Sequence, residues 1–141
     1  NVCLEIKTSR DIARQILRHR SFSFQEFSQR YAKVEEPPVF KQARLQDFKN
    51  RQNSIDTEDD DLKRWWQEKQ EFIVTESNRL YQAALEQGIA KEVARSVLPE
   101  GLTPSTIYMN GTIRSWIHFI QLRTGNGTQK EHREIALECA K

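Results

Sequence analysis

A strongly cationic segment occupies residues 10–31, where five arginines and one histidine stand against only two acidic residues. Within it, Arg18, His19 and Arg20 are consecutive, and Arg30 follows in the same stretch. Guanidinium groups donate paired, charge-assisted hydrogen bonds to phosphate oxygens and keep their proton at neutral pH. The segment therefore predicts a binding site for a phosphorylated ligand.

Two other arginines of this segment have a simpler interpretation. Arg10, Arg14 and Arg18 are spaced four residues apart, on the side of a predicted helix opposite its apolar residues. For Arg10 and Arg14, ordinary surface ion pairs are sufficient. We expect function from Arg18, Arg20 and Arg30, which lie among aromatic residues.

The composition limits the functions that are open to the chain. Its 141 residues carry 22 Lys and Arg against 20 Asp and Glu, so the whole surface lacks the strong positive field of a dedicated nucleic-acid binder. The length fits one domain. Only 37% of the residues are hydrophobic and 30% are charged, so we expect partner subunits to cover part of the surface and add to its burial. Asn1 begins inside a predicted strand, so we expect a truncated N-terminus.

Cysteine usage points to a reducing compartment, and hydropathy gives no sign of a membrane span. Cys3 and Cys139 lie at opposite ends of the chain and outside any metal-binding spacing, so no metal site is expected. No apolar run reaches the roughly 18 residues of a membrane span, and no leader peptide is recognisable. We expect a cytoplasmic protein without a membrane partner, in which both thiols act as small buried apolar residues.

The elements that position the cationic segment follow no regular strand-helix rhythm. Alternating apolar residues predict a strand at 2–7, and an acidic run at 57–61 predicts the start of a long helix that ends at Gly88. The other predicted elements are a helix after the first strand, an extended active loop at 21–34, a short helix at 89–98, a strand at 106–110 and helices at 113–122 and 129–141; residues 41–56 show little periodicity. The pattern predicts an α+β fold in which a small antiparallel or mixed sheet packs with several helices, one of them long.

Apolar spacing also predicts which helix faces are buried. The residues expected to face inward are Ile12, Ala13, Ile16 and Leu17 in the first helix, Leu62, Trp65, Trp66, Phe72, Ile73, Leu80, Ala84 and Leu85 in the long helix, and Ile113, Trp116, Ile117 and Ile120 in the helix at 113–122.

Three motifs carry a resemblance to a known family. Residues 18–20 and 26–31 read Arg-His-Arg and Glu-Phe-Ser-Gln-Arg-Tyr, residues 94–99 read Ala-Arg-Ser-Val-Leu-Pro, and the helix at 114–123 is followed by Gln129 and Glu131. In order and spacing these resemble the flavin-dependent thymidylate synthases, the ThyX family. The resemblance covers nearly all of residues 1–141 as a single domain. We expect that residues 1–141 lack the family's N-terminal segment and also its extreme C-terminus.

The resemblance implies the reductive methylation of dUMP to dTMP. In the family, methylenetetrahydrofolate donates the carbon to C5 of the nucleotide, FAD carries the hydride that completes the methyl group, and NADPH reduces the flavin. No cysteine nucleophile takes part. The family forms homotetramers whose active sites take residues from several subunits, and neither a metal nor a nucleic acid is implied as a partner.

Residue roles follow from the matched motif positions. The positions implied to bind dUMP are Gln15, Arg18, Glu26, Phe27, Ser28, Gln29, Arg30, Arg95 and Arg123. The positions implied to bind FAD are Arg18, His19, Arg20, Ser21, Arg114, His118 and Leu122. Ser28 and Arg123 are the implied catalytic residues, and Arg123 would stabilise negative charge that develops on the pyrimidine. His132 receives no functional role.

The chain departs from the family pattern at positions that bear on the flavin contacts. Gln25 and Thr112 stand where the family usually has Asn, and Gly127 stands near a position where His is common. A homologue without catalytic activity is therefore an alternative.

A second alternative is a single-stranded nucleic-acid-binding module. Arginines would bind its phosphates and aromatic rings would stack on its bases. The residues in question are Arg18, Arg20, Arg30, Phe22, Phe24, Phe27 and Tyr31. The near-neutral net charge and the second set of spaced residues from 95 to 123 argue against it.

Overall fold

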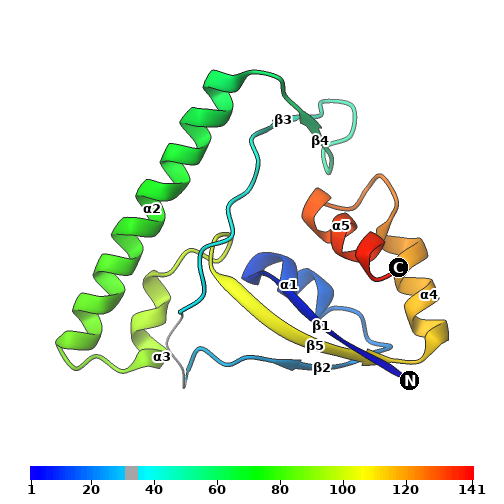
Figure 1. The fold of residues 1–141 in the computed structure, drawn as a ribbon, viewed down its shortest axis with the longest axis horizontal. Helices are drawn as coiled ribbons and strands as arrows, with labels where there is room; N and C mark the ends of the chain where they lie inside the picture. Colours follow the sequence, from blue (N-terminus) through cyan, green and yellow to red (C-terminus); the bar gives the residue numbers. More distant parts are fainter. Residues whose placement is uncertain (31–34) are drawn as a thin grey trace.

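The computed structural model describes residues 1–30 and 35–141, and these form the predicted α+β fold. The strands are β1 (Val2–Ser9), β2 (Ser23–Glu26), β3 (Arg44–Gln46), β4 (Ser54–Asp56) and β5 (Pro104–Gly111). The helices are α1 (Arg10–Ile16), α2 (Asp60–Glu86), α3 (Lys91–Ala94), α4 (Ile113–Arg123) and α5 (Lys130–Glu138), and a 3-10 turn, η1, follows α3 at Arg95–Val97. In Figure 1, α1, α4 and α5 gather beside the larger sheet, whereas α2 stands apart from it with α3 near its C-terminal end.

A three-stranded antiparallel sheet in the order β1-β5-β2 forms the base of the fold. Ile6 of β1 lies opposite Ile107 of the central strand, and both are buried. The prediction of a loop over residues 21–34 is wrong for β2, which pairs with β5 from Ser23 to Glu26. Four residues are too few to show an alternating pattern, and β2 forms because the edge of β5 supplies hydrogen-bond partners.

The hydrophobic core lies between this sheet and three helices. Ile12, Ala13 and Ile16 of α1 are fully buried, as predicted, and Leu17 is half-buried. The face predicted for α4 is partly wrong. Trp116 and Phe119 are the buried residues of this helix, whereas Ile113 and Ile117 are 63% and 51% exposed. Apolar residues surround α4 on several sides, so their spacing alone does not select the buried face.

The long helix α2 begins and ends as the sequence predicted. Asp59 caps it by accepting a 3.0 Å hydrogen bond from the Leu62 backbone N–H, and Gly88, with a φ of 82°, follows its end. Its apolar face is not buried within the chain, however, since Trp65 and Phe72 are 51% and 63% exposed. The described part of the chain thus leaves this face open to a partner.

A small antiparallel hairpin, β3–β4, occupies the stretch for which no element was predicted. Strands of three residues give no readable period. Two ion pairs to α5 hold the hairpin: Arg44 with Glu131 at 2.7 Å and Lys130 with Asp56 at 3.0 Å.

Candidate functional site

Arg123, the last residue of α4, contacts His19, which follows α1. The Nε–H of Arg123 donates to Nε2 of His19 at 2.9 Å, which joins the Arg-His-Arg segment to the C-terminal helices. Burial, together with the positive charges of Arg123 and His118, lowers the pKa of His19 to about 4. The ring is therefore neutral at pH 7, and because Nε2 accepts, its proton lies on Nδ1.

An aromatic cluster fixes the position of His19. The ring lies edge-on to Phe119 with centroids 4.9 Å apart, and Phe22 lies 6.5 Å away on another side. Phe22 in turn packs against Trp116 at 4.9 Å. The close approach of Phe22 to β5 requires a glycine at Gly111, where a Cβ atom would lie 2.5 Å from the ring. Core packing, rather than a loop, thus holds this part of the site.

Gln15 lies in the same region, within a polar cluster between α1 and α5. Its Nε2 donates to Oε1 of Gln129 at 2.8 Å, and its Oε1 lies 3.3 Å from Nδ1 of His132. His132 is fully buried, and its ring lies 6.2 Å from that of His19. Sequence reasoning assigned His132 no role. The one signal toward this cluster was the Gln129 and Glu131 spacing.

A second group of predicted residues lies at the end of β2. Glu26 accepts a 2.7 Å hydrogen bond from the Ser105 hydroxyl, and Gln29 is buried. Ser28 is exposed, and its Oγ accepts from the Arg30 backbone N–H at 3.3 Å. The contacts at the end of β2 therefore fix the backbone of this motif, while the hydroxyl of Ser28 remains accessible.

Two predicted phosphate ligands meet at Glu92 of α3. Arg30 forms an ion pair with its carboxylate at 3.1 Å, and Nε of Arg95 donates to its backbone oxygen at 3.2 Å. Two guanidinium groups from distant parts of the sequence therefore contact the same residue, one at its carboxylate and one at its backbone oxygen.

The remaining predicted residues are exposed. Arg114, His118 and Leu122 lie on α4, and Arg18, Arg20 and Ser21 lie between α1 and β2. Phe27, at the end of β2, is 59% exposed. Within the described ranges, the predicted residues fall into several groups: His19 with Arg123, Gln15 with Gln129 and His132, the β2-end group, Arg30 with Arg95 at Glu92, and exposed residues on α4 and between α1 and β2.

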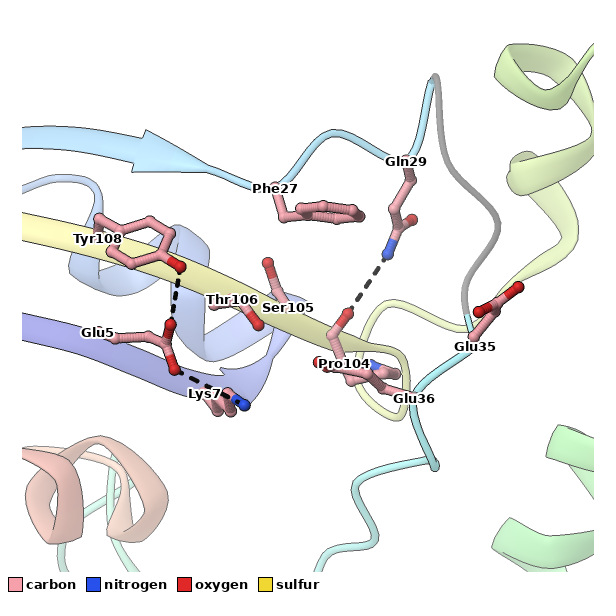
Figure 2. A pocket seen from close by; sticks show the side chains of 10 residues that line it. All are labelled: Glu5, Lys7, Phe27, Gln29, Glu35, Glu36, Pro104, Ser105, Thr106 and Tyr108. Atoms are coloured by element: carbon pink, nitrogen blue, oxygen red, sulfur yellow. Dashed lines mark hydrogen bonds and ion pairs between the residues drawn. The ribbon is translucent and has the colours of Figure 1, made fainter.

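A hollow of about 330 Å³ opens beside the β2-end group, over the face of the sheet that carries Glu5 and Tyr108 (Figure 2). Phe27 and Gln29 line it, together with Glu5, whose carboxylate accepts a 2.7 Å hydrogen bond from the Tyr108 hydroxyl. Glu35 and Glu36 add further negative charge to its rim, and Lys7 is the one cation among the described residues that line it. The charge of these described lining residues disfavours a phosphate at this position.

The interpretation of Arg10 and Arg14 as structural residues is confirmed. Both pair with Glu100, at 3.6 and 2.6 Å, and the Arg14 hydrogen bond holds the pKa of that carboxyl below its usual value. The expectation of a buried Cys3 is wrong, because β1 presents it to solvent. Cys139 packs against the core, and burial raises the pKa of its thiol.

The departures from the family pattern fall at exposed positions. Thr112 caps α4, since its Oγ1 accepts a 3.1 Å hydrogen bond from the Ser115 backbone N–H. Gln25 and Gly127 are also exposed. Tyr31, proposed as a stacking residue in the nucleic-acid alternative, lies outside the described residues. That alternative is not supported, because Phe22 and Phe24 pack against the core instead of offering free ring faces.

The described residues contain no cluster of His, Cys, Asp and Glu suited to a metal ion. Among the helices of the described ranges, none combines the length and apolarity that a bilayer crossing needs.

The chain is similar to proteins named as flavin-dependent thymidylate synthases. The chain is 62% identical over 136 residues to a probable flavin-dependent thymidylate synthase of Paramecium bursaria Chlorella virus 1, covering 96% of the chain and 62% of the relative. It is 53% identical over 141 residues to the flavin-dependent thymidylate synthase of a Synechocystis strain, covering all of the chain and 65% of the relative. The chain therefore spans less than two thirds of the length of these relatives.

Its structure also resembles a solved one. The UMP/dUMP methylase PolB from Streptomyces cacaoi, bound with 5-Br UMP, superposes with a TM-score of 0.84 at 26% sequence identity, over 96% of this chain and 65% of that chain. The family model described as thymidylate synthase complementing protein matches residues 1–141. The chain therefore belongs to the thymidylate synthase complementing protein family, as its motifs predicted.

Proposed function

We propose that residues 1–141 form one domain of a flavin-dependent thymidylate synthase that methylates dUMP reductively to dTMP, with methylenetetrahydrofolate as carbon donor and NADPH as reductant. The observation that carries the proposal is the 2.9 Å hydrogen bond between Arg123 and His19, because it joins two of the family's motifs at one point. The names of the similar proteins support the same reaction.

Arg123 has the geometry of a charge-stabilising group. The hydrogen bond from its Nε–H to His19 fixes the plane of the guanidinium, and its terminal amino groups then donate to the pyrimidine oxygen on which negative charge develops. Preorganised donors of this kind lower the barrier because they do not have to reorient during the reaction. The neutral state of His19 supports this role, since a second positive charge would compete with Arg123 for that oxygen.

The nucleotide phosphate is held by the β2-end group. Arg30 and Arg95 supply charged donors that both contact Glu92, and the Ser28 hydroxyl completes the phosphate site. Arg18 and Glu26 orient the sugar and base together with Arg123, while Gln15, Phe27 and Gln29 complete the binding set. A phosphate replaces Glu92 as the partner of Arg30, which keeps the guanidinium paired in both states.

The residues predicted for the flavin suit its chemistry. Arg114 and His118 lie on the exposed side of α4 near the exposed apolar Ile117 and Leu122, a combination of cationic and apolar groups that matches a diphosphate joined to a planar ring. Arg18, Arg20 and Ser21 add exposed donors, and His19 lies behind them. When bound, FAD supplies the hydride that completes the methyl group.

We further propose that a homotetramer completes the active site. His19, Arg123 and the α4 residues do not line the hollow beside the β2-end group, and the apolar face of α2 lies open with Trp65, Phe72 and Leu80 exposed. Packing that face against a second copy would bury it and bring groups from different subunits together. The free thiols Cys3 and Cys139 suit a reducing cytoplasm.

Calorimetric titration of the full-length protein tests the binding half of the proposal. We expect a tight, noncovalent FAD complex, dUMP binding to the flavin-loaded protein, and a tetramer by light scattering. Protein that folds and forms the tetramer but binds neither ligand contradicts the proposed function.

A further inference from the structure

A chain of hydrogen bonds runs from the β3–β4 hairpin to the interior of the fold. Both terminal nitrogens of Arg44 donate to the Glu131 carboxylate, at 2.7 and 3.1 Å. Nε2 of Gln129 donates to Oε2 of Glu131 at 3.0 Å, and Nε2 of Gln15 donates to Oε1 of Gln129 at 2.8 Å. The chain ends where Oε1 of Gln15 meets Nδ1 of His132 at 3.3 Å.

Glu131 sets the direction of every bond in this chain. An ionised carboxylate only accepts hydrogen bonds, so the Gln129 amide must turn its NH₂ group toward it and its oxygen toward Gln15. Burial opposes ionisation of Glu131, but the hydrogen bonds from Arg44 and Gln129 prevail and lower its pKa. The acceptor at the start of the chain is therefore permanent at neutral pH.

The same logic continues through Gln15 to His132. Gln15 donates its NH₂ group to Gln129, which leaves its oxygen to face His132. His132 must then donate through Nδ1–H, and its Nε2 is left as a bare lone pair. That Nε2 atom is buried and has no hydrogen-bond partner within the described ranges, as expected of a nitrogen whose tautomer is dictated from the other side of the ring.

We propose that Glu131 is a positioning residue that acts through Gln129 to lock the amide of Gln15, which His132 contacts on its other side, in one orientation for the nucleotide. Gln15 then offers the ligand a fixed order of donor and acceptor, because its two amide groups cannot exchange places without breaking bonds on both sides. The identity of the ligand rests on the proposed function. The direction of the hydrogen bonds does not depend on it.

The tautomer of His132 in the ligand-free, full-length protein provides the first test. Burial, with smaller contributions from Arg123 and His19, lowers the pKa of His132 to about 4, so its ring carries a single N–H proton at neutral pH. In protein labelled with ¹⁵N-histidine, with the signal assigned by its loss in His132→Gln, we expect the Nδ1–H tautomer. The Nε2–H tautomer would overturn the proposal without the need for a destabilising variant.

Glu131→Gln provides the second test. The new amide can accept from Arg44 through its oxygen and donate to Gln129 through its NH₂ group, which reverses each amide in the chain. We expect the Nε2–H tautomer of His132 to appear and KM for dUMP to rise about tenfold with kcat little changed. Glu134→Gln, at an exposed position of the same helix, and Arg44→Lys, which keeps the carboxylate partnered, should leave the tautomer as in the wild type.

The outcomes of these tests are separable. If the His132 tautomer is unchanged in Glu131→Gln, the proposed order of donors and acceptors along the chain of hydrogen bonds is overturned. If the tautomer reverses but KM for dUMP keeps its wild-type value, the positioning role of Glu131 is overturned. Failure of the wild-type protein to form dTMP contradicts the proposed function instead, and is read in a separate assay.

Discussion

His19 and Arg123, from opposite ends of the chain, share one hydrogen bond in which a neutral imidazole accepts from a guanidinium at 2.9 Å. The bond requires His19 to resist protonation, which its burial and the neighbouring cations ensure. It also ties the half-buried Arg123 to the core, since Phe119 of α4 packs against His19. The contact therefore couples the packing of His19 to the orientation of the Arg123 guanidinium.

Gly111→Ala should destabilise the fold by about 1–3 kcal/mol, because the added Cβ would lie 2.5 Å from the Phe22 ring, within the core. Urea denaturation of the full-length protein at fixed concentration measures the loss. Gly125→Ala is the matched control, since its Cβ would meet only the Leu122 backbone oxygen at 3.7 Å. Equal stability of the two variants would show that the packing of Phe22 over β5 is not as described.

Acid should weaken the fold in a window set by two histidines, the half-buried His19 and the fully buried His132. The folded-state pKa values of His19 and His132 are both lowered from 6.5 to about 4. Between these values the unfolded chain binds more protons than the folded one, so the free energy of unfolding falls as the pH falls through the window. Carboxylates with lowered pKa values, such as Glu100 with its usual pKa of 4.5, add to this loss of stability mainly at lower pH.

Urea unfolding midpoints measured at about pH 7.5 and at about pH 5 test this dependence. We expect most of the decrease in the midpoint to occur in this interval, above the pH at which carboxylates titrate. His132→Gln should show a shallower decline, whereas His118→Gln, at an exposed position, should decline nearly as the wild type does. A midpoint that is flat across this range would mean that neither histidine is held neutral.

Much of the fold could be predicted from local pattern. The alternation at 2–7, the acidic run at 57–61 and Gly88 each have a local physical cause, and they correctly marked β1 and the ends of α2. β2 and the β3–β4 hairpin could not be found, because strands of three or four residues depend on partners far away in the sequence. Propensity carries little information at that length.

The candidate site was predictable only in part. Motif spacing pointed to His19 and Arg123, but no local pattern states that their side chains meet. Arg44 and His132 were missed because one lies in a polar stretch without periodicity and the other resembles any core histidine. Their roles depend on a hydrogen-bond chain assembled by the tertiary fold.

Arg30→Ala and Arg95→Ala should each weaken dUMP binding by about 1.5–3 kcal/mol, as expected on loss of a charge-assisted hydrogen bond. Deoxyuridine, which lacks the phosphate, should bind the variants and the wild type alike. Arg14→Ala is the control, because that arginine is engaged with Glu100. Titration calorimetry with both ligands distinguishes the cases, and equal losses for dUMP and deoxyuridine would remove the phosphate role.

The double variant Cys3→Ser with Cys139→Ser should retain most of the turnover. Cys3 is exposed on β1, and the pKa of Cys139 is raised by burial, so neither lies where an activated thiolate is expected. Some loss of stability from Cys139→Ser is expected, because the residue packs against the core. A nucleotide adduct on either cysteine, detected by mass spectrometry, would contradict the mechanism.

Formation of dTMP by the full-length, flavin-loaded protein tests the central claim most directly. With dUMP, methylenetetrahydrofolate and NADPH supplied, the wild type should form dTMP, and Arg123→Ala should lose about 100-fold or more in kcat while retaining its flavin. The opposite result would be a folded, flavin-loaded wild type that forms no dTMP, or an Arg123→Ala variant that turns over at the wild-type rate.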